Sequence, residues 1–158
     1  MAETAEMQTY ELGTGQSMLV LEISIDPVKV DLSHENPWKE RAAQSRAEAL
    51  RLASCKLLDI EFTELVSGYR IRSNRDTAFI DVYLYDSLSS GAGYASAAAE
   101  HITEILHTGE FILRECDCDS ACSRCLKHYR NQFVHSSLDR YAALQLLEWG
   151  RSGGSLNK

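Results

Sequence analysis

The order of apolar and polar positions along the chain predicts both strands and helices. Residues 18–25 form a short apolar run, rich in branched side chains and ended by an Asp-Pro pair, which is typical of a largely buried strand. Residues 69–72 alternate between polar and apolar, residues 73–76 favour a turn, and residues 78–86 are strongly apolar again. We interpret these last segments as an antiparallel hairpin.

A helical pattern separates the first strand from the hairpin. Asn36 and Pro37 suit the N-cap and the first helical position, and we expect the helix to end near Leu58. Small and apolar residues recur at steps of three and four and define one face. They are Trp38, Ala42, Ser45, Ala49, Leu52 and Cys55, the last as a small core residue. Charged residues are expected on much of the remaining surface, namely Arg41, Arg46, Glu48, Arg51 and Lys56.

Two more helices are predicted in the second half of the chain. The first covers residues 94–107 and follows a Gly-Ala-Gly turn. The second covers residues 138–149, where Ser136 begins a Ser-x-x-Asp cap and Gly150 suits the C-terminal stop.

These elements predict one α+β domain over residues 17–150, with a small mixed or antiparallel sheet, packed helices and a cysteine-rich knot near its C-terminus. The polar segments 1–16 and 151–158 are expected to form a flexible arm and a flexible tail. No apolar run approaches the ~20 residues that a membrane-spanning helix needs. The polar, acidic start does not predict a secretory signal, so we expect a reducing, cytoplasmic environment and no membrane partner.

Four of the five cysteines are clustered, at Cys116, Cys118, Cys122 and Cys125. Cys-x-Cys followed by Cys-x-x-Cys gives two short chelating pairs, each able to wrap one metal ion. Zn²⁺ takes four thiolates at tetrahedral corners, with Zn–S distances of about 2.3 Å. Small and turn-forming residues between the cysteines allow backbone amides to point at the sulfurs. The spacing predicts a closed Cys₄ site, residues 116–125, for one structural zinc ion.

Other cysteine chemistry competes with structural zinc. Disulfides need an oxidising compartment. An iron–sulfur cluster also uses four thiolates, although its usual spacings differ, and a catalytic zinc keeps its fourth position open. His128 and His135 lie just beyond the cluster, where either could replace a cysteine as a ligand. Spacing alone does not separate zinc from an iron–sulfur cluster.

Catalytic chemistry has weaker support in the sequence. The Gly-Ala-Gly turn could cradle an anion, but it matches no phosphate-loop pattern, and we interpret its glycines as allowing a tight turn and close packing. A metal-dependent nuclease or phosphotransfer domain would need clustered carboxylates. Asp81 and Asp86 flank one strand on opposite faces, and a turn-capping role is favoured for Asp86. No catalytic residue is predicted.

Five short segments, taken in order along the chain, together match the pattern of a known domain. They are Tyr85-Asp86, Gly91-Ala92-Gly93, the cysteine cluster with Leu126, Tyr129-Arg130-Asn131-Gln132 and Leu138-Asp139-Arg140. Together they resemble the MrfA-type zinc-binding domain, over most of the chain from about Met18. The resemblance implies a C-terminal accessory domain of superfamily 2 DNA helicases, as in repair helicases and in anti-phage systems such as DISARM and Druantia. It also implies that the four clustered cysteines bind one zinc ion.

The chain departs from this family pattern in size. It contains no Walker-type lysine loop and no Asp-Glu-x-His motor motif. We therefore expect either an excised domain or a free-standing subunit, which docks on a helicase motor in the same or a separate chain and helps to shape a DNA path.

Contact with single-stranded or forked DNA would have to come from a local patch, because the net charge of −7 argues against a generally basic surface. Arg124, Lys127, Arg130 and Arg140 could supply that patch, with Tyr129 as a stacking surface. The same residues could equally be solvated side chains among acidic neighbours. A protein–protein adaptor without direct DNA contact is therefore the alternative function. The side-chain amides of Asn131 and Gln132 are expected to bridge loop backbone around the cysteines rather than to contact substrate.

Overall fold

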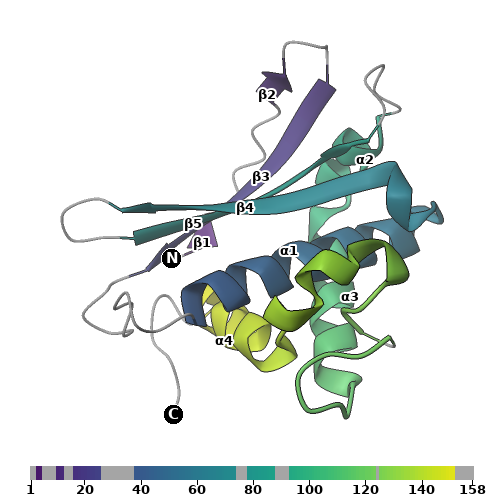
Figure 1. The fold of residues 1–158 in the computed structure, drawn as a ribbon. Coiled ribbons are helices and arrows are strands. Elements are labelled where there is room, and N and C mark those ends of the chain that lie inside the picture. Colours follow the sequence, from purple (N-terminus) through teal and green to yellow (C-terminus); the bar gives the residue numbers. More distant parts are fainter. Residues whose placement is uncertain are drawn as a thin grey trace.

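A computed structural model describes residues 3–4, 10–12, 16–25, 38–73, 78–87, 93–123 and 125–151. This part of the chain is an α+β fold, with helices packed against one antiparallel sheet (Figure 1). Both the fold class and the antiparallel hairpin predicted from the sequence are confirmed. None of the described helices is long and apolar enough to cross a membrane.

The sheet has the strand order β1-β3-β5-β4 (β1 Glu3–Thr4, β3 Gln16–Ile25, β5 Ala78–Asp86, β4 Leu65–Ser73), and β2 (Tyr10–Leu12) also pairs with β3. Every one of these described pairings is antiparallel. The two strongly apolar strands, β3 and β5, lie side by side at the centre. The short strands β1 and β2, which hydrogen-bond to β3, lie within residues 1–16, the segment expected to form a flexible arm.

One face of β5 carries the core. Ile80, Val82 and Leu84 are fully buried and belong to a single apolar cluster with side chains from α1 (Trp38–Leu58), α2 (Tyr94–Glu100), α3 (Ile102–Glu115) and α4 (Arg140–Arg151). The four helices therefore cover the same face of the sheet, as Figure 1 shows.

Helix α1 lies at the centre of this layer, because it packs on β4 and β5 on one side and on α3 and α4 on the other. It ends at Leu58 as predicted, while its proposed start at Asn36 and Pro37 lies outside the described residues. The expected polar surface is wrong for three residues, because Arg46, Glu48 and Arg51 are 3%, 3% and 9% exposed. Helix α1 packs against strands on one side and helices on the other, which leaves Lys56 exposed and Arg41 half-buried.

The helix predicted over residues 94–107 is two helices. α2 ends at Glu100, and α3 begins at Ile102 after His101, whose backbone (φ −111°, ψ 26°) leaves the helical region. α3 then continues to Glu115, so the cysteine cluster starts directly at its end. α4 begins at Arg140, where the carboxylate of Asp139 accepts from the amides of Tyr141 and Ala142 at 3.0 and 3.4 Å. Asp139, rather than the predicted Ser136, therefore caps α4.

Candidate metal centre

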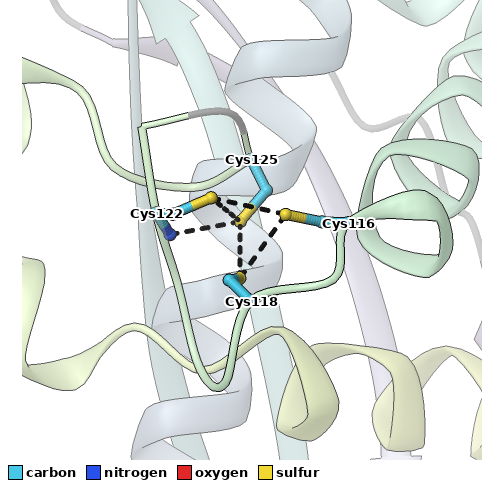
Figure 2. Close-up of side chains that lie close together, drawn as sticks. All are labelled: Cys116, Cys118, Cys122 and Cys125. Atoms are coloured by element: carbon cyan, nitrogen blue, oxygen red, sulfur yellow. Dashed lines mark hydrogen bonds between the residues drawn. The ribbon is translucent and has the colours of Figure 1, made fainter.

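The four cysteines come from the end of α3 and from the loop after it. Cys116 is the C-cap of α3, and its extended backbone (φ −75°, ψ 139°) ends the helix. Cys118 follows in the loop. A tight turn then returns Cys122 and Cys125, with the amides of Cys125 and Lys127 donating to the Cys122 carbonyl at 3.1 and 2.9 Å. Figure 2 shows the four side chains converging on one point.

The sulfur atoms have the spacing of a tetrahedral site. Cys116 Sγ lies 3.5 Å from Cys118 Sγ and 3.3 Å from Cys122 Sγ. Cys125 Sγ lies 3.6 Å from Cys118 Sγ and 3.9 Å from Cys122 Sγ, and all four atoms are within 4.8 Å of one another. Four sulfurs held about 2.3 Å from a zinc ion would stand about 3.8 Å apart. The cluster is therefore compatible with one zinc ion.

Burial and the neighbouring thiols make Cys125 hard to ionise without a cation. Burial raises the pKa of the Cys125 thiol to about 12; the thiols of Cys118 and Cys116 add to the rise, while the backbone amides of Cys122 and Leu126 oppose it. The Cys122 amide donates to Cys125 Sγ at 3.4 Å, as the turn-forming spacer residues predicted. Four adjacent thiolates repel one another, so a soft divalent cation is the natural occupant of this donor set.

The geometry does not support a disulfide in the cluster. All five cysteines are free, and the 3.3 Å between the sulfurs of Cys116 and Cys122 far exceeds the ~2.05 Å of a disulfide bond. Cys55 is buried in the core as predicted, 5% exposed. The two histidines have other contacts: His128 stacks on Phe62 with ring centroids 4.1 Å apart, and His135 Nε2 donates to the His128 carbonyl at 2.9 Å.

Asn131 ties the loop behind the cysteines to the rest of the fold. Its Oδ1 accepts from the His128 amide at 2.7 Å, and its Nδ2 donates to the Leu126 carbonyl at 3.0 Å, which confirms the predicted role in bridging loop backbone. The same Nδ2 donates to Glu48 of α1 at 3.0 Å. No sequence pattern predicts this last bond. Gln132, expected to share the bridging role, is exposed.

The predicted DNA-contacting residues do not form one described patch. Arg124 lies outside the described residues, as do the side chains of Tyr129 and Arg130, whose backbone belongs to the 3₁₀ segment η2 (Tyr129–Ser137). Lys127 is half-buried beside the turn. Arg140 is only 5% exposed, so its assignment to a surface patch needs correction.

The two carboxylates considered for catalysis both have protein partners. Asp86, 3% exposed, accepts from the amides of Gly93 and Ala95 at 2.9 Å each, which confirms the turn-capping role at the start of α2. Asp81 accepts from Arg70 and Arg72 across the β4–β5 pair, at 2.9 and 2.7 Å. Gly91 and Ala92 of the Gly-Ala-Gly turn lie outside the described residues.

Comparison with known proteins identifies similar domains. The family described as MrfA Zn-binding domain matches residues 46–126, about half of the chain, and this range contains all four clustered cysteines. The Druantia protein DruE of Escherichia coli (strain UMEA 4076-1) is 40% identical over 143 residues. That alignment covers 86% of this chain but 8% of DruE.

Two solved structures share the fold. A crystal structure of the helicase MrfA bound to DNA matches with a TM-score of 0.56 at 13% identity, over 89% of this chain and 23% of that one. A structure of MrfA bound to DNA and AMPPNP matches with a TM-score of 0.52 at 11% identity, over 92% and 22%. The chain thus spans less than a quarter of each of these proteins.

Proposed function

Because the chain belongs to the MrfA Zn-binding domain family, we propose that it is a zinc-stabilised, non-catalytic accessory domain of a helicase-like protein. The observation that carries the proposal is the set of four converging thiols inside the family match. In this proposal Cys116, Cys118, Cys122 and Cys125 hold one zinc ion in a closed shell. A closed shell leaves no position for substrate or activated water, so the ion's role is structural.

The zinc would determine local folding. Closely spaced cysteines of the loop between α3 and η2 bring little order until a metal holds them, so metal affinity becomes folding free energy for this segment. The ordered loop fixes the end of α3 relative to the start of α4, whose Arg140 amide donates to the Ser120 carbonyl at 2.7 Å.

Docking on a motor is supported by aromatic side chains that the fold leaves exposed. Phe111 of α3 and Tyr141 of α4 are 65% and 51% exposed, and Phe133 of η2 is 83% exposed. An open hollow of about 640 Å³ lies beside Phe111 and is also lined by His107 and Arg114. Large exposed aromatics and arginines are the residue types that anchor protein interfaces.

We also propose that the domain itself contacts DNA and so contributes to a DNA path. MrfA is bound to DNA in the structures that share this fold. In the present chain Arg124 lies inside the cysteine cluster in sequence, and Lys127, Tyr129 and Arg130 follow it. The alternative is an adaptor that contacts only protein, which the net charge of −7 favours.

Two binding measurements separate these functions. The motor probe is DruE without its matching segment, and the DNA probes are labelled single-stranded and forked oligonucleotides. Phe111→Ser should weaken motor binding without affecting DNA, and Arg130→Gln should weaken DNA binding and reduce its salt dependence. Gln132→Ala, in an exposed neighbour, serves as the control for both. If the chain binds the motor but not DNA, the adaptor function is supported. If neither variant weakens the interaction that it targets, the proposed surfaces are contradicted.

A further inference from the structure

Arg140 connects the end of α3 to the first half of the cysteine loop. Its Nε donates to the Cys118 carbonyl at 2.9 Å, and its Nη1 donates to the Leu113 carbonyl in the last turn of α3 at 3.0 Å. Its own amide donates to the Ser120 carbonyl. Nη2 completes the set by donating to Tyr141 Oη at 2.7 Å. One 5%-exposed side chain therefore fixes the backbone before and inside the cluster.

Arg140 also places a positive charge beside the cysteine cluster. Four thiolates around one divalent cation carry a net charge of −2, and Glu115, Asp117 and Asp119 beside them are acidic and exposed. A guanidinium remains charged at any pH that the fold tolerates, and its planar fork can serve several acceptors at once.

We propose that Arg140 is a positioning residue of the zinc centre, which holds the cysteine loop in its binding conformation and compensates for the charge of the thiolates. The inference rests on the proposed function. It assigns Arg140 to the metal site, in place of DNA contact.

The same residue links the metal to helix packing. Arg140 is the first residue of α4, and the preceding Asp139 donates its amide to Ser45 Oγ of α1 at 2.7 Å. Ala142 and Leu146 of α4 lie in the main core cluster. Loss of the metal should therefore release the start of α4 together with the loop.

Zinc affinity, measured by competition with a chromophoric chelator, tests the inference. Arg140→Met should lower the affinity by about 10–100-fold, the range seen when residues that support metal ligands are removed. Arg140→Lys restores charge without the three-acceptor fork and should recover part of the loss. Tyr141→Phe removes one hydrogen bond and keeps the charge, and Lys56→Met removes an exposed charge on α1; both should stay near wild type.

The inference would be overturned if Arg140→Met binds zinc with an affinity within about twofold of wild type. Equal losses of affinity in Arg140→Lys and Arg140→Met would show that the charge of Arg140 does not contribute.

If Arg140→Met does not fold, hydrogen exchange on the wild-type chain tests the inference instead. Chelation should then deprotect residues 140–144 together with 116–126, while continued protection of 140–144 would contradict the link. A wild-type chain that binds no zinc would instead overturn the proposed function.

Discussion

The Nδ2 group of Asn131 donates to the carboxylate of Glu48, 83 positions earlier in the chain, at 3.0 Å. Both residues are buried, at 0% and 3% exposed. Asn131 also accepts from His135 Nε2 at 2.7 Å and holds the backbone on either side of the turn after Cys125. This amide therefore joins the segment after the zinc loop to the central helix α1 by a buried hydrogen bond.

Asn131→Ala should destabilise the domain by about 2 kcal/mol or more, because it leaves several buried partners without a hydrogen bond. Urea unfolding of the zinc-loaded chain measures the loss. Gln132→Ala, next to it and exposed, should change the stability by less than about 0.5 kcal/mol. Equal stabilities of the two variants would show that the Asn131 network contributes nothing.

Glu48 predicts a pH dependence with a defined sign. Burial raises its pKa, and this outweighs the opposing effects of the Asn131 hydrogen bond and the charges of Arg51 and His135. The folded state therefore binds the Glu48 proton more tightly than the unfolded state does. The contribution of Glu48 to the free energy of unfolding is fully present below its pKa in the unfolded chain. It is lost as the pH rises through its pKa in the folded chain.

Glu48→Gln keeps an acceptor for Asn131 and removes this titration. The stability of the variant relative to wild type should therefore increase as pH rises from 4.5 through neutrality. Paired urea midpoints at each pH cancel effects that both chains share, such as protonation of the cysteines. A constant difference between the two chains, or a difference that shrinks with pH, would contradict the assignment.

Two glycines predict opposite responses to the same substitution. Gly68 lies opposite Tyr83 in the β4–β5 register, and a Cβ at Gly68 would collide with the Tyr83 ring. A Cβ at Gly109 in α3 would instead make ordinary contacts, 3.7 Å from Ala53 Cβ and 3.8 Å from the Ala49 carbonyl.

Gly68→Ala should therefore destabilise by about 1 kcal/mol or more, because the ring must move off the sheet. Gly109→Ala should stabilise by about 0.5–1 kcal/mol through its helix preference. Thermal or urea unfolding measures both. In a Tyr83→Ala background the cost of Gly68→Ala should largely disappear, and a cost that persists there would locate the strain elsewhere.

The sequence predicts best where the information is local. The spacing of the four cysteines within one loop indicated their convergence, and apolar runs located β3, β5 and α1 because strand and helix periods are properties of short segments. Asp86 was also predicted correctly, since a carboxylate just before a glycine-rich turn often caps it.

The sequence predicts less well where neighbours come from distant parts of the chain. Arg140 resembled a solvent-exposed cation, because nothing nearby in sequence indicates that carbonyls of residues 113 and 118 surround it. Glu48 and Arg51 belonged to the polar pattern of α1, yet η2 and the other helices bury that side as well. Strands β1 and β2 owe their existence to pairing with β3, which short polar segments do not reveal.

The central claim is a structural zinc ion held by four specific thiols, and metal analysis of chain purified without added metal tests it most directly. We predict one zinc per chain in a colourless sample, with the same content in Cys55→Ser and a loss of zinc in Cys125→Ser. A brown sample that contains iron would indicate an iron–sulfur cluster instead. Full zinc content in Cys125→Ser, or none in the wild-type chain, would contradict the site itself.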